Sequence, residues 1–183
     1  MRSLPLFIEG KGARFVHACW EEAVIEELVA ISDRGVLKPE QLILAGRKCE
    51  RLYDLVETTT KGPEAKLPQG YSFSDKGGHL RNKVRLKWWE GSARTWRDIA
   101  ISVADPLKLP AEKLPDGIVK SVYPSKAPPV FFGHYWLDGS ITLQAPNALC
   151  LDYSAGKDGP LIAYRMKDVS TSIDLVNVVG GMA

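Results

Sequence analysis

Short runs of alternating apolar and polar residues open the chain, and helical spacing follows them. Residues 4–9 and 13–19 are two such runs separated by Gly10-Lys11-Gly12, which predicts a β-hairpin with a glycine-containing turn. Residues 21–31 place apolar side chains three and four positions apart with glutamates opposite, which predicts an amphipathic helix. Two further helices are expected, over residues 39–44 and 49–57.

Glycine and proline are frequent in residues 61–78 and 106–129, which are expected to be long loops within one domain. Residues 79–89 alternate between apolar and basic side chains, which predicts a strand. Residues 96–103 are also expected to form a strand because of their β-branched content, with a helix as the alternative. Later strands are expected over residues 130–132, 141–143, 149–153 and 161–165.

Helices lie mostly early and strands mostly late, but strands also bracket the helices, so the expected class is mixed α/β. The 183 residues suit a single domain, residues 1–183, and their composition is that of a globular protein. A net charge of +2 gives no strong nucleic-acid or membrane signal, and no apolar run is long enough to span a membrane. Three widely spaced cysteines and the lack of a secretory signal predict a cytoplasmic protein.

Two of the three histidines, His17 and His134, each follow a short apolar run. Each is therefore expected at the carboxyl end of a strand, where the sites of α/β proteins collect. Gly133 lets backbone or a ligand approach the second histidine closely. Imidazole is a good ligand for divalent transition metals, so the pair is a candidate metal site. On spacing alone, the commoner interpretation of such a histidine is a hydrogen-bonded structural residue.

Several segments resemble the calcineurin-like metallophosphoesterases, in particular the bacterial phosphoprotein phosphatase and diadenosine tetraphosphate hydrolase group. Val16-His17-Ala18 resembles one histidine motif of this group and Gly133-His134 resembles its late Gly-His motif. The most specific segment is Pro129-Val130-Phe131-Phe132-Gly133-His134-Tyr135-Trp136. The resemblance runs from about the first residue to Arg165, and its other stretches are residues 4–7, 16–20, 147–154 and 161–165.

The resemblance implies the C-terminal part of a metallophosphoesterase β-sandwich flanked by helices, with the N-terminal half missing. It also implies two divalent metal ions, of the manganese, iron or zinc type, with His17 and His134 ligating the second. The family's other ligand motifs are not found in this sequence. The segment Asp33-Arg34-Gly35 lacks the preceding Gly-Asp and comes after His17, so it is interpreted as a turn that ends a helix.

The function implied by the resemblance is metal-dependent hydrolysis of a phosphoester, by the full-length parent, on a phosphorylated substrate of unknown class. A two-metal hydrolase needs a carboxylate that bridges its ions, so this chain alone is expected to bind metal weakly and to be inactive. The alternative is a non-catalytic, truncated or partner-dependent fragment. Ligand motifs encoded in frame upstream of Met1 would favour the enzyme, and their absence would favour the fragment.

Two weaker expectations concern the surface. Arg81 and Arg85 are candidates for substrate binding because guanidinium groups match phosphate geometry, although a solvated sheet edge is the commoner interpretation of such a basic face. Trp88 points to the opposite face, which argues against a nucleic-acid groove. The strand before His17 is expected to have an unpaired edge that leaves Phe15 and Val16 poorly covered, which would favour self-association.

Overall fold

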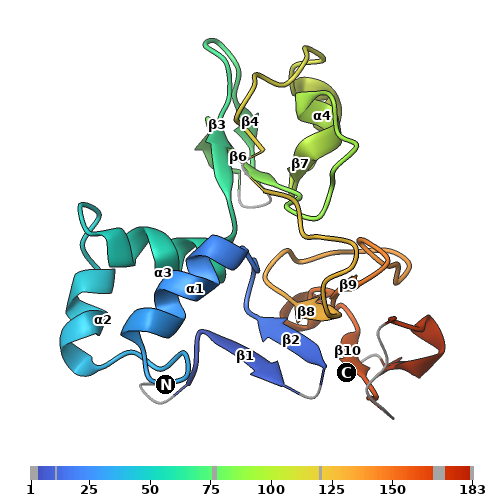
Figure 1. The fold of residues 1–183 in the computed structure, drawn as a ribbon. Helices are drawn as coiled ribbons and strands as arrows, with labels where there is room; N and C mark the ends of the chain where they lie inside the picture. Colours follow the sequence, from blue (N-terminus) through green and yellow to red (C-terminus); the bar gives the residue numbers. More distant parts are fainter. Residues whose placement is uncertain (1–3, 11, 76–77, 120, 167–171, 182–183) are drawn as a thin grey trace.

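The computed structural model describes residues 4–10, 12–75, 78–119, 121–166 and 172–181. It combines α-helices with small β-sheets, which confirms the expected mixed α and β class. Three helices lie beside a central sheet, a smaller lobe rises from this body, and the chain ends in a hairpin (Figure 1). Within the described residues, no helix combines the length and the apolar character needed to cross a membrane.

The central sheet has the strand order β1-β2-β8-β9. Strands β1 (Phe7–Gly10) and β2 (Ala13–Val16) form the expected antiparallel hairpin. Strand β8 (Val130–Phe132) runs parallel to β2, and β9 (Ala148–Cys150) runs parallel to β8. Every residue of β8 and β9 is buried, as is typical of parallel strands covered on both faces. The carboxyl ends of these three strands therefore meet at one edge of the sheet.

Strand β2 is hydrogen-bonded on both sides, so the expectation of an open edge beside His17 is wrong. The hairpin supplies β1 as one neighbour, and Val16 is only 8% exposed. Phe15 lies on the opposite face and stacks on Phe131, with ring centres 5.5 Å apart. Among the described strands, none pairs with the outer side of β1, so β1 is one of the two edge strands of the sheet, and β9 is the other.

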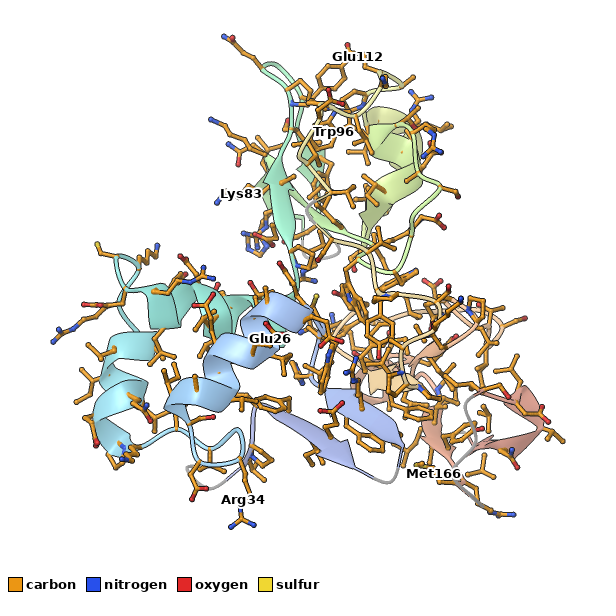
Figure 2. The ribbon with its side chains drawn as sticks, viewed as in Figure 1. Glu26, Arg34, Lys83, Trp96, Glu112 and Met166 are labelled. Carbon is orange, nitrogen blue, oxygen red and sulfur yellow. The ribbon has the colours of Figure 1, made fainter. Side chains whose placement is uncertain are left out.

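The three helices expected before residue 62 are confirmed as α1 (Glu22–Ile31), α2 (Pro39–Ala45) and α3 (Arg51–Lys61). Helix α1 buries Val24, Ile25 and Leu28 in the main core, whereas Glu26 lies on its outer side (Figure 2). Helix α3 ends at Lys61, directly before Gly62, and not at residue 57 as expected. Gly62 ends it with φ 79° and ψ 170°, a conformation that is nearly restricted to glycine.

The smaller lobe has a core of its own. Strands β3 (Glu64–Lys66), β6 (Lys83–Leu86) and β7 (Ala100–Ile101) form an antiparallel sheet with the order β3-β6-β7, next to helix α4 (Trp96–Ile99). Trp96 lies inside this lobe and is 1% exposed, whereas Lys83 projects outward from β6 (Figure 2). The lobe thus separates α3 from β8 in the sequence while leaving β2 and β8 adjacent in space.

Three expectations for this lobe are wrong. The long loop expected over residues 61–78, of which residues 76 and 77 lie outside the described chain, is interrupted by β3 and β4 (Phe73–Ser74), whose residues Ala65 and Phe73 are buried in the lobe. The strand expected over residues 79–89 is two strands, β5 (Leu80–Arg81) and β6, because β5 pairs with β4 while β6 pairs with β3 and β7.

The third concerns residues 96–103, where α4 precedes the short β7 instead of one strand. Thr95 and Asp98 start this helix with a capping box. The Asp98 backbone N–H donates to the Thr95 hydroxyl at 3.3 Å, and the Thr95 backbone N–H donates to the Asp98 carboxylate at 2.8 Å. These bonds satisfy backbone donors at the helix start, so the capping residues outweigh the β-branched content.

In the C-terminal part, residues 106–129 are mostly irregular as expected, apart from the short helix η1 (Pro106–Lys108); residue 120 lies outside the described chain. The strand expected over residues 141–143 is absent, because Ile141 and Leu143 cover one face of the sheet without joining it. Strand β9 ends at Cys150 rather than at residue 153. Strand β10 (Leu161–Tyr164) is confirmed and pairs with β11 (Val178–Gly181).

Candidate metal and anion site

The parallel pairing of β2 and β8 determines where His17 and His134 lie. In this pairing Phe15 lies opposite Phe131. The ladder continues past both strands, because the Gly133 backbone N–H donates to the His17 carbonyl oxygen at 2.9 Å. A Cβ atom at Gly133 would lie 3.3 Å from the Cβ of Asp152, so glycine permits this close approach, as expected. Both histidines therefore emerge at the same edge of the sheet.

The two imidazole rings lie side by side, with centroids 5.2 Å apart and an interplanar angle of 58°. The expected proximity of His17 and His134 is thus confirmed. A nitrogen bound at about 2.1 Å places its ring centre about 3.2 Å from a metal, so two ligands at a tetrahedral angle have ring centres about 5 Å apart. The observed separation fits two imidazoles that share one ion. His17 is exposed and His134 is partly buried.

His134 has two unusual features. Its backbone φ is 74°, in the left-handed region that non-glycine residues seldom adopt. Its Nε2 atom is buried and has no hydrogen-bond partner among the described residues. Buried polar atoms usually have a partner, so this nitrogen is a strong candidate for a ligand bond.

The surroundings of His134 keep its imidazole neutral. Burial is the largest cause that lowers the pKa of His134 from 6.5 to about 4, and the neighbouring Arg85, His17 and Lys61 act in the same direction. The Asp152 carboxylate opposes them but is outweighed. At neutral pH the ring therefore keeps a lone pair, which metal ligation requires.

Asp152 is a residue of this site that the sequence did not single out. Its carboxylate accepts hydrogen bonds from the backbone N–H groups of Trp136, at 3.2 Å, and Ser154, at 3.1 Å. Its own carbonyl oxygen accepts the Leu137 N–H at 2.9 Å. These bonds fasten the turn that carries His134 to the segment after β9. The signal was available, because Asp152 follows β9 much as His134 follows β8.

The two candidate arginines occupy different places. Arg85 lines a pocket together with His134, near the paired imidazoles. Arg81 is more than half exposed and its Nε donates to the Asp75 carboxylate at 2.8 Å. Of the two, only Arg85 is placed to meet a ligand that also reaches His134.

The described residues contain no group of three or more His, Cys, Asp or Glu side chains with the geometry of a metal site. The histidine pair is therefore a group of two, without a third such side chain among the described residues. Searches of protein-family models, curated proteins and solved structures found no match to this chain.

Proposed function

We propose that His17 and His134 are two ligands of a divalent metal ion in a phosphoester hydrolase, and that this chain supplies only part of the metal site. The observation that carries the proposal is the pair of imidazoles whose ring centres are 5.2 Å apart, together with the buried Nε2 of His134, which has no hydrogen-bond partner in the part of the chain that the structure describes. These residues are 117 positions apart in the sequence (134 − 17). The proposed fold for this function is the C-terminal part of a metallophosphoesterase β-sandwich.

The sequence motifs support the same proposal independently of the geometry. Val16-His17-Ala18 and Gly133-His134 resemble two histidine motifs of the calcineurin-like metallophosphoesterases. In that family both histidines ligate the second of two metal ions. Two short motifs are weak support, but here the residues that carry the resemblance also lie together at the ends of adjacent strands.

Each residue then has a definite task. A divalent ion bound by the two imidazoles would act as a Lewis acid on a phosphoryl oxygen. His134 is in its neutral, ligating form because its pKa lies well below 7. Arg85 presents a planar guanidinium next to His134, and this group matches the oxygens of a phosphate. Asp152 holds the turn that positions His134.

A two-metal hydrolase also requires a carboxylate that bridges its ions. We propose that this carboxylate and the remaining ligands come from outside this chain, in a longer parent or a partner chain. The isolated chain is then expected to hydrolyse phosphoesters at a negligible rate. A non-catalytic, partner-dependent fragment is the second candidate function, and the short ligand set of the described residues favours it.

The test is a titration of the chain with cobalt(II), followed by visible absorption and by calorimetry. We expect weak binding that is lost in His17→Ala and in His134→Ala. His79→Ala is the matched control, because the His79 side chain is 73% exposed and lies beside Asp75. Binding that ignores both substitutions would refute the site. Hydrolysis of an aryl phosphate with manganese, abolished by His134→Ala, would show that the site is complete within the chain.

A further inference from the structure

The pocket that Arg85 and His134 share lies beside the histidine pair, on the side of the smaller lobe. It has a volume of about 260 Å³, and its lining includes Arg85, Ser102, His134, Trp136 and Lys157. These residues come from β6, from the residue after β7, from the turn after β8, and from the short helix η2 (Ala155–Lys157). The pocket thus lies where the smaller lobe meets the ends of the central strands.

Unusual backbone conformations gather at this place. The described residues include six non-glycine residues with positive φ, and five of them line this pocket or an adjacent one that shares Trp136 and Lys157. The five are Ser102, His134, Trp136, Ser154 and Asp158. Each such residue costs roughly 1–3 kcal/mol, and such residues concentrate at ligand-binding sites. The segments around the pocket therefore adopt backbone conformations that are energetically unfavourable for these residues.

The lining of the pocket is net positive. Arg85 Nε and the Glu64 carboxylate form only a long ion pair, with Nε 3.9 Å from Oε1, and the guanidinium makes no hydrogen bond within the described part of the chain. Lys157 contributes a second cation. The lining also contains Asp75, but its carboxylate accepts hydrogen bonds from the Arg81 Nε at 2.8 Å and the His79 N–H at 2.9 Å. An anion in this pocket meets two cations and one carboxylate that is already neutralised.

Trp136 provides an aromatic wall beside these cations. Its side chain is large and apolar, yet the residue is 45% exposed. The Lys157 ammonium lies over the indole ring, 4.6 Å from the ring centre. An anion that binds Lys157 is therefore held near the indole, so an aromatic group attached to that anion is within reach of the ring.

We propose that this pocket is the substrate site of the hydrolase and that it selects phosphate monoesters of planar aromatic alcohols. The phosphoryl group binds between Arg85 and Lys157, next to His134, and the aromatic leaving group packs against Trp136. That the bound phosphate is a substrate rests on the proposed function, whereas its binding in the pocket requires no metal. Aromatic contact gives a preference over alkyl phosphates of about 3- to 10-fold.

The test measures binding of phenyl phosphate and glycerol 2-phosphate to the full chain in the presence of a chelator. Indole N–H resonances in ¹⁵N-correlated spectra follow the titration and report whether each variant is folded. We expect phenyl phosphate to bind more tightly. Trp136→Asn, which tolerates the left-handed backbone, should abolish that preference. Arg85→Gln and Lys157→Gln should each weaken both ligands about 10-fold.

Lys83→Gln is the matched control, because Lys83 lies on β6 two residues before Arg85 and outside the pocket. Equal binding of both phosphates, or binding that Arg85→Gln and Lys157→Gln leave unchanged, would overturn the proposal. The cobalt titration on the same variants separates the two hypotheses. Metal binding without phosphate binding in the pocket removes the substrate site alone, and phosphate binding without metal binding removes the proposed hydrolase.

Discussion

Acid should destabilise the folded chain through His134. In the folded state this imidazole is half-buried, and the neighbouring Arg85, His17 and Lys61 also lower its pKa, whereas Asp152 raises it. Together these surroundings lower its pKa from 6.5 to about 4. In the unfolded chain the same imidazole is solvated and regains its ordinary pKa.

The sign of the effect follows from proton binding. As the pH falls from about 6.5 to about 4, the unfolded chain binds a proton at this histidine and the folded chain does not. The free energy of unfolding therefore decreases as the pH falls through this window. The decrease would be about 3 kcal/mol for a group shielded from water, at about 1.4 kcal/mol per pH unit. Because His134 is only half-buried, solvent screening reduces it, and we expect about 1–2 kcal/mol.

The assay is urea unfolding followed by tryptophan fluorescence, at about pH 7 and about pH 4.5, with a chelator present. Carboxylates elsewhere also titrate in this range, so the comparison with a variant carries the information. His134→Asn removes the imidazole and suits the positive φ of this position. We expect the loss of stability on acidification to be smaller in this variant by about 1–2 kcal/mol. His79→Asn makes the same change at an exposed histidine and serves as the control.

An NMR titration of the His134 ring Cε1–H resonance measures the pKa directly. A midpoint near 6.5 or above would refute the reasoning, because burial and the neighbouring Arg85 and Lys61 would then have no net effect. Equal acid sensitivity of the wild type and His134→Asn would refute the link to stability.

Three further results are expected. Gly62→Ala should destabilise the fold by about 2–4 kcal/mol, because its Cβ would overlap the buried Tyr135 hydroxyl and its backbone is in a region that alanine avoids; Gly70→Ala, with positive φ but open space, isolates the backbone cost in the same urea assay. Asp152→Ala should weaken cobalt binding about 10-fold, because the turn that carries His134 loses its anchor; unchanged calorimetric affinity would contradict this role. Any self-association of the chain should use the open edge of β1, so light scattering should detect fewer oligomers for Ile8→Lys, and equal oligomer content would exclude this edge.

The elements that were predicted well are those whose structure depends on residues close together in the sequence. Val24, Ile25 and Leu28 face the core at helical spacing, so α1 was predicted with its ends almost correct. The first hairpin was predicted from two short runs and a glycine turn, because its pairing is local. In both cases the residues that decide the structure are neighbours in the sequence.

Predictions failed where the partner is distant or where a single side chain decides. Alternation over residues 79–89 indicated a strand but contained nothing about which strands it would join. The segment is divided between two sheets, because β5 pairs with β4 while β6 pairs with β3 and β7, and Leu80 is 74% exposed on the short β5. In the lobe's helix, the capping residues Thr95 and Asp98 outweighed the β-branched content of the segment. The edge prediction for β2 failed because its second partner is the distant strand β8.

The same distinction applies to the candidate site, in which the histidine pair was predictable and the pocket beside it was not. Residues at strand ends are predictable, because the carboxyl ends of adjacent parallel strands meet, and this brought His17 and His134 together. The pocket beside them depends on turns at Trp136 and Ser154 with positive φ, and no glycine or asparagine marks these positions in the sequence. Such turns persist only when surrounding contacts enforce them, and here the Asp152 carboxylate bonds the backbone N–H of both residues. The geometry of the site is therefore set by one carboxylate at the end of a third strand, and it becomes visible only when all three strand ends are seen together.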